Sequence, residues 1–188
     1  MSASPIFAYA KLNARIQPMD RGDLYEDPLQ QALEATGLAE VTGGGTMQMQ
    51  SGEIEYCGID LDLHDPENAV ALICATLERL GAPKGSSLSY EADGRRHEVP
   101  FGRLEGLAIY FNGTDLPDHV YAECDINHVW AEIERLIEGV GRIQSYWQGP
   151  TETALYLYGD SAARMRERIA GFMAEYPLCA QARYDTVA

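Results

Sequence analysis

The chain repeats one pattern of apolar residues at a fixed separation of 95 residues. The pattern alternates over two stretches and then takes up a helical spacing. It pairs Leu12, Ala14 and Ile16 with Leu107, Ile109 and Phe111; Ile59, Leu61, Leu63 and Asp65 with Ala154, Tyr156, Tyr158 and Asp160; and Val70, Cys74 and Leu77 with Met165, Ile169 and Phe172. Each half has the length of a small domain, so the repeat predicts two copies of one folding unit.

Each half has the same predicted order of elements, β-α-β-β-α-β. In the first half alternation predicts strands over 11–17, 46–50, 53–64 and 87–92. Two helices begin at Asp27-Pro28 and Asp65-Pro66, where an N-cap residue precedes a proline. In the second half we expect strands over 105–112, 142–147, 153–158 and 182–187, and helices capped by Asp125 or Asn127 and by Asp160 or Ser161.

This order, met twice, resembles the ferredoxin-like α+β sandwich, in which an antiparallel four-stranded sheet carries two helices on one face. The resemblance covers residues 8–93 and 104–188, and the polar segment 94–103 is the expected connector. The segments 149–156 and 176–179 are also similar to uncharacterised bacterial proteins. The resemblance implies a topology and no activity.

Alternation also assigns two faces to each predicted sheet. In the first half the outward face is polar and carries Asp60 and Asp62. In the second half we expect Ala154, Tyr156 and Tyr158 to face the helices, and the outward face to carry Ala108, Tyr110, Leu155 and Leu157, with Tyr146 or Trp147 alongside. A sheet that is apolar on both faces is usually covered on both, so the first half, a second copy, the connector or a ligand is expected there.

The charge is strongly acidic and uneven. The 14 Lys and Arg against 29 Asp and Glu give a net charge of −15. Residues 1–94 hold 15 acids and 5 bases, which is −10, and residues 95–188 hold 14 acids and 9 bases, which is −5. Direct binding to nucleic acid needs a basic surface and is not expected. With neither a signal-peptide pattern nor an apolar run near the roughly 20 residues of a membrane span, we expect a cytoplasmic protein without membrane contact.

The candidate sites are few. Asp60, Asp62 and His64 alternate on one strand and form a weak candidate for a metal site, although a solvated strand face explains them better. The hairpin 145–152 contains Tyr146, Trp147 and Glu152, and aromatic residues of this kind dominate binding surfaces. The loop 112–118 is expected to be a plain turn. No catalytic residue and no cofactor are predicted.

These features favour a non-catalytic protein-binding module. The acidic first half would meet a basic partner surface, as an immunity-type inhibitor of a cationic toxin does, with the Tyr146/Trp147 hairpin and Glu152 anchoring contacts. A first alternative is a small-molecule-binding protein or an enzyme with its site on the apolar sheet face of the second half, lined by Tyr110, Tyr146 and Trp147 and including Leu155 and Leu157. A second alternative is a homodimeric scaffold.

Overall fold

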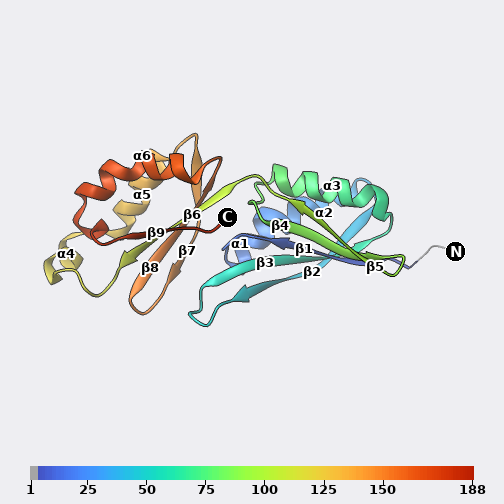
Figure 1. Cartoon of the computed structure of the whole chain (residues 1–188), viewed down its shortest axis with the longest axis horizontal. Coiled ribbons are helices and arrows are strands. Elements are labelled where there is room, and N and C mark those ends of the chain that lie inside the picture. The colour runs from blue at the N-terminus through green and yellow to red at the C-terminus, as the bar shows by residue number, and fades with distance from the viewer. Residues whose placement is uncertain (1–3) are drawn as a thin grey trace. The chain divides into compact units, whose positions relative to one another are not determined.

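The computed structural model describes residues 4–188, which divide into two compact units (Figure 1). The first unit contains the chain up to Gln50 together with Ile54–Arg103. The second contains Leu104–Ala188 and also the short segment Ser51–Glu53. Both units are α+β, and each places its helices on one face of an antiparallel sheet, as in two tandem ferredoxin-like units.

The first unit has a five-stranded sheet in the order β2-β3-β1-β4-β5. Its helices lie together on one side of that sheet, as Figure 1 shows. Along the chain the elements are β1 (Ile6–Leu12), α1 (Pro18–Arg21), a π-helical turn (Gly22–Glu26), α2 (Asp27–Glu34), β2 (Ala39–Gln48), β3 (Ile54–Leu63), α3 (Pro66–Arg79), β4 (Ser86–Ala92) and β5 (Arg95–Phe101).

Most of residues 94–103, the expected connector, form the strand β5 of the first unit. This strand pairs with β4 along its full length, from Ser86 opposite Phe101 to Ala92 opposite Arg95. Its exposed, charged sequence shows little apolar alternation because it is an edge strand with only Phe101 buried. The first sheet therefore has five strands instead of the expected four.

The first two strands are also displaced from the expected positions. The strand β1 ends at Leu12, and the backbone N–H of Asn13 instead donates to the Ser86 hydroxyl, so the chain leaves the ladder before the predicted end at residue 17. The strand β2 begins at Ala39, before the predicted start at residue 46, and runs through Gly43, Gly44 and Gly45. Side chains of an ion pair, Arg21 and Glu26, lie where a Cβ on Gly44 would project, which explains a glycine inside this strand.

The helix α3 begins and ends as its sequence predicts. The Asp65 side chain accepts a hydrogen bond from the backbone N–H of Asn68, and Pro66 occupies the first turn. The chain turns away at Gly81, which has a φ of 97°, a value that favours glycine. The buried face packs Ile73 and Leu77 toward the sheet.

The second unit has a four-stranded sheet in the order β7-β8-β6-β9, and α5 and α6 cover one face (Figure 1). The core between them is a single cluster of buried apolar side chains. The elements are β6 (Glu105–Asn112), α4 (Asp118–Glu123), α5 (Ile126–Leu136), β7 (Gly141–Gln148), β8 (Glu152–Gly159), α6 (Ala162–Glu175), a 3-10 turn (Pro177–Cys179) and β9 (Arg183–Thr186).

The two helices that follow β3 and β8 lie 96 residues apart in the sequence, one more than the predicted period. Asp65 and Ser161 are their N-cap residues. Their buried positions correspond at the same separation, with Ala69, Ile73 and Leu77 matching Met165, Ile169 and Met173. The predicted period of 95 is therefore wrong by one residue over this part of the chain.

That single residue reverses the predicted faces of β8. Leu155 and Leu157 stand opposite Ile109 and Leu107 of β6 and belong to the helix-covered core. Tyr156, expected to face the helices, instead stands opposite Ala108 on the other face. A shift of one residue moves every side chain of a strand to the opposite face, so Leu155 and Leu157 are not outward residues.

The edge strands β2 and β7 both contain shifts in register. In β2 one shift falls between Val41 and Gly43 and a second between Met47 and Gln48, and in β7 the shift falls between Ile143 and Ser145. After the shift in β7, Tyr146 lies opposite Leu155 and faces the helices, while Trp147 lies opposite Ala154 on the other face. This register shift thus places Tyr146, and not Trp147, on the helix-covered face of the sheet.

Candidate functional site

A cavity of about 450 Å³ opens on the helix-covered side of the second sheet. Its floor is formed by neighbouring residues of β6, β8 and β7, where Phe111 stands opposite Thr153 and Thr153 stands opposite Gln148. Helices α4 and α5 and the 3-10 turn supply the remaining walls. The lining residues are Phe111, Asn112, Gly113, Tyr121, Ile126, Asn127, Trp130, Tyr146, Gln148, Thr153, Leu155 and Leu178.

Aromatic side chains from several elements line this cavity. Trp130 of α5 and Tyr146 of β7 meet edge to face, with ring centroids 6.2 Å apart and an interplanar angle of 75°. Tyr146 is 50% exposed, although its edge packs on Trp130. The position of Trp130 follows from the start of α5, where Asp125 accepts a hydrogen bond from the backbone N–H of Asn127.

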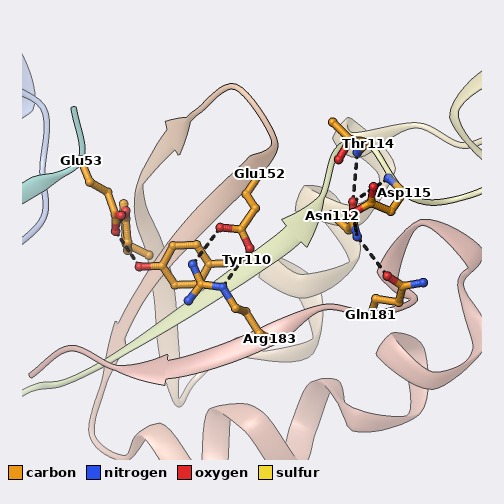
Figure 2. Close-up of polar contacts among 9 residues, drawn as sticks. Glu53, Tyr110, Asn112, Thr114, Asp115, Glu152, Gln181 and Arg183 are labelled. Atoms are coloured by element: carbon orange, nitrogen blue, oxygen red, sulfur yellow. Dashed lines mark hydrogen bonds and ion pairs between the residues drawn. The ribbon is translucent and has the colours of Figure 1, made fainter. Parts of the chain in front are cut away.

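The loop that follows β6 is more ordered than the expected plain turn. The Asn112 side-chain oxygen accepts hydrogen bonds from the backbone N–H groups of Thr114 and Asp115, at 3.0 and 2.9 Å, and the amide nitrogen donates to Gln181 (Figure 2). The Tyr121 hydroxyl donates to the Asn112 carbonyl. These bonds fix the rim of the cavity and lead directly into α4.

A second cluster of polar groups lies on the opposite face of the same sheet. The hydroxyls of Tyr110 and Tyr156 both donate to Oε1 of Glu53, each at 2.6 Å. All three residues are buried, and Glu53 is only 7% exposed. Figure 2 shows the Glu53 carboxylate, from the Ser51–Glu53 segment of this unit, at the Tyr110 hydroxyl. Bonds from two hydroxyls to one charged oxygen are short and strong, so the cluster holds that segment against the sheet.

An ion pair extends this cluster along the sheet. Arg183 of β9 donates to both carboxylate oxygens of Glu152, at 2.8 and 2.9 Å, and its guanidinium carbon lies 3.5 Å from the centroid of the Tyr110 ring (Figure 2). The hydrogen bonds from Arg183 lower the pKa of the Glu152 carboxyl, and the same contact raises the pKa of Arg183. The pair joins the start of β8 to β9 across the strand β6.

The face of the first sheet away from its helices is rich in acidic groups. In one row across the strands, Glu40 stands opposite Asp62 and Asp62 stands opposite Phe7, which is 58% exposed. Register places five acidic and two basic residues on this face: Glu40, Asp60, Asp62, Glu91 and Glu98, with Lys11 and Arg96. We call these residues, together with Phe7 and Tyr9, the acidic face.

Within the acidic face, Tyr9 lies over a glycine. A Cβ on Gly58 would meet the Tyr9 ring, so the tyrosine lies flat across the neighbouring strand. Burial raises the pKa of the Tyr9 hydroxyl, and the neighbouring Tyr56 and Asp60 act in the same direction. The Lys11 ammonium lies 4.3 Å from the centroid of the Tyr56 ring. An aromatic surface thus accompanies the carboxylates.

The weak candidate for a metal site is not supported. Among residues 4–188 no three His, Cys, Asp or Glu side chains are grouped so that they could hold a metal ion. Asp60 and Asp62 are half-buried on the acidic face, and the Nε2 atom of His64 lies 3.9 Å from a Glu40 carboxylate oxygen. Because His64 follows the end of β3, the alternation that grouped it with the two aspartates does not continue through it.

The thiols of Cys57, Cys74 and Cys179 are poorly suited to nucleophilic chemistry. Burial raises the pKa values of Cys57 and Cys179 to about 12 and that of Cys74 to about 11. A thiol reacts as its thiolate, so these three groups are unreactive near neutral pH.

The predicted site residues therefore divide among four places. Tyr146 and Leu155 line the cavity, and Tyr110 and Glu152 belong to the polar cluster on the opposite face. Leu157 lies in the core, and Trp147 lies half-buried on the face of the polar cluster. Asp60 and Asp62 lie on the acidic face.

Sequence reasoning missed Glu53, Trp130 and Phe7. Glu53 is an acid just after a Ser-Gly turn, and nothing in its local pattern distinguishes it from the other acids. Trp130 has the spacing of a residue in the buried face of a helix, which indicates packing and gives no sign of a binding site. Phe7 lies before the first predicted strand, and moving that strand toward the N-terminus would have placed it on the outward face.

Solved structures to which this chain is similar have low sequence identities and low TM-scores. No protein-family model matches the chain, and no curated protein sequence matches it. An unknown protein from Galdieria sulphuraria is 14% identical, with 98% of each chain covered and a TM-score of 0.29. A protein from Fusobacterium nucleatum named "Putative monooxygenase" is 10% identical, with 99% of this chain and 92% of that chain covered and a TM-score of 0.32. The regulatory subunit of aspartate kinase from Thermus flavus is 10% identical, with 89% and 92% covered and a TM-score of 0.27.

At these identities and TM-scores the likeness extends to no function. No helix within residues 4–188 is both long and apolar enough to cross a bilayer.

Proposed function

We propose that the chain is a non-catalytic protein-binding module whose acidic face receives a basic partner surface. The observation that carries this proposal is the row of Glu40, Asp62 and Phe7 across three neighbouring strands. It sets two carboxylates directly opposite each other beside an exposed aromatic ring. The row lies within one unit, on the face of the sheet away from the helices.

The arrangement of Glu40 and Asp62 works against the stability of the sheet. Like charges directly opposite each other on neighbouring strands destabilise the pair, by up to about 1 kcal/mol. A cationic group from a partner would remove this repulsion when it lies between the carboxylates. Binding would therefore relieve a repulsion that destabilises the free protein, and this relief would add to the free energy of binding.

The exposed ring of Phe7 adds an apolar contact to this charge. Phe7 has 58% of its surface exposed, next to a carboxylate and near Tyr9 in the same strand. Interfaces combine buried aromatic anchors with charged surroundings, and Lys or Arg side chains also pack on aromatic faces. The partner surface that fits best is therefore basic, with an apolar position for Phe7.

An immunity-type inhibitor of a cationic toxin has these properties. Opposite charge on two proteins speeds their encounter and makes the association rate fall steeply with salt. The net charge of −15 favours the same behaviour. The partner of such an inhibitor is a basic protein, and inhibition by binding requires no catalytic group in this chain.

Binding of a short, fluorescein-labelled polylysine peptide tests the acidic face. Anisotropy titrations at low and at near-physiological salt would compare the wild type with the double variant Glu40→Gln/Asp62→Asn. A control variant, Glu67→Gln/Glu138→Gln, removes the same charge from exposed positions outside the acidic face. We expect salt-sensitive binding that the first variant weakens several-fold and the control leaves nearly unchanged. Equal weakening in both variants, or affinity that does not depend on salt, would refute the proposal.

A further inference from the structure

The cavity of the second unit has the size of a site for a small molecule. Its volume of about 450 Å³ lies in the range of roughly 300–1,000 Å³ that ligand sites occupy. At roughly 30 Å³ per molecule of liquid water, it equals about fifteen waters. One or two fused or linked rings fit this space, whereas a folded peptide element does not.

The lining of the cavity carries no charge. None of its twelve lining residues among the described part of the chain is acidic, basic or histidine, although the protein as a whole is strongly acidic. A charged ligand would lose its hydration there without meeting an opposite charge, which is costly. The occupant that suits this lining is neutral.

The walls favour a flat aromatic molecule. Phe111 forms part of the floor, and the edge-to-face pair of Trp130 and Tyr146 stands at one side. Aromatic rings attract one another in offset and edge-to-face arrangements. A planar ring inserted beside Trp130 would extend the arrangement that this pair already has.

Polar groups at specific points can orient such a ligand. Thr153 and Gln148 lie side by side in register on the floor. Asn127 lies in the first turn of α5, where its amide nitrogen donates to the Asp125 carboxylate, which fixes the amide at the edge of the cavity. Their hydroxyl and amide groups bond to neutral carbonyl or hydroxyl groups. Asn112 and Tyr121 instead bond to the loop that follows β6, and so shape the rim.

Two segments that stand out in the sequence meet at this cavity. The loop 112–118 contributes Asn112 and Gly113, and the hairpin 145–152 contributes Tyr146 and Gln148. They are separated in the sequence by two helices, α4 and α5. We propose that the cavity is a binding site for a neutral, planar aromatic molecule that carries hydrogen-bonding groups. This site is independent of the acidic face.

A matched pair of dyes tests the proposal on the full chain. N-phenyl-1-naphthylamine is neutral and aromatic, and 8-anilinonaphthalene-1-sulfonate is the same skeleton with a sulfonate. Titration followed by dye fluorescence should give saturable binding of the neutral dye and at least about tenfold weaker binding of the sulfonate, because the cavity offers no counter-charge.

Two substitutions fill the cavity from different elements. Gln148→Phe fills it from the edge strand β7, and Asn127→Phe fills it from α5. If one variant fails to fold, the other variant still tests the proposal. The control Gln31→Phe adds the same ring at an exposed position of α2. Each cavity variant should weaken binding of the neutral dye at least about tenfold, and the control should bind as the wild type does. Failure of the neutral dye to bind, equal affinity for the sulfonate, or cavity variants that bind normally would overturn the proposal.

Discussion

Removal of one hydroxyl from Tyr156 is expected to destabilise the second unit by an amount that depends on the charge of Glu53. In the substitution Tyr156→Phe the ring stays and the bond to Oε1 of Glu53, 2.6 Å long, is lost. A hydrogen bond to a charged group contributes about 1.5–3 kcal/mol, and one between neutral groups about 0.5–1.5 kcal/mol. We therefore expect a loss of about 1.5–3 kcal/mol in the wild type.

The same substitution made in a Glu53→Gln background separates charge from packing. Glutamine keeps the shape of the side chain and one carbonyl oxygen as acceptor, but the acceptor is neutral. In that background Tyr156→Phe should cost only about 0.5–1.5 kcal/mol. The difference between the two costs is the part of the interaction that requires the carboxylate.

The chain contains a natural probe for this measurement. Its two tryptophans, Trp130 and Trp147, both belong to the second unit. Urea unfolding followed by tryptophan fluorescence therefore reports the stability of the unit that contains the Glu53 cluster. A control, Tyr184→Phe, removes a hydroxyl from a half-buried tyrosine of β9 whose ring contacts Arg166.

Equal costs of Tyr156→Phe in the two backgrounds would refute this account of the cluster. The hydroxyl would then contribute through packing or through another acceptor, and the charge of Glu53 would be irrelevant to it. A loss of unfolding free energy in Tyr156→Phe no larger than that in Tyr184→Phe would also refute this account. Circular dichroism of each variant before unfolding ensures that all of them start from the same fold.

Three further predictions concern single contacts. Glu40→Gln should stabilise the first unit by a few tenths to about 1 kcal/mol in thermal unfolding at low salt, because it removes repulsion from Asp62; destabilisation would contradict the assigned register. Asp65→Ala should cost about 0.5–2 kcal/mol in thermal unfolding, because α3 loses its N-cap, and Asp65→Asn should retain most of the stability. Folding lowers the pKa of Glu152 from its ordinary value of 4.5, so its pairing with Arg183 adds stability above that pH, which is lost as the pH falls through the lowered value. The variant Arg183→Gln should show a smaller loss of stability between pH 5 and pH 3, and an unchanged acid profile would exclude this pair as a contributor.

Much of the element order of both units could be predicted because the strongest signals are local. Asp65-Pro66 and Asp125 are N-cap signals, and the alternation of β3 and the hairpin of β7 and β8 needs no distant partner. The strand β5 could not be predicted in the same way. It lies at the edge of the sheet with most of its side chains exposed, so no apolar alternation marks it.

The faces of β8 could not be assigned because nearly every residue of this strand is apolar. Leu155 and Tyr156 are both buried, one under the helices and one beneath the Glu53 cluster. When both faces are apolar, alternation carries no information, and the assignment rested on a period that was wrong by one residue. The pairing of Glu53 with Tyr110 spans 57 residues, and such a contact has no local sequence signal.

The four outer strands of the two sheets all resist addition of a further strand. The shifted registers of β2 and β7 interrupt the row of groups that a new strand would need, β5 carries charged side chains and Pro100, and β9 has only four residues. Growth of either sheet by pairing with another molecule is thereby discouraged. A companion protein that docks on this chain must therefore use side chains on the broad surfaces, where charge and shape can discriminate between companions, and not the backbone, which any extended peptide could match.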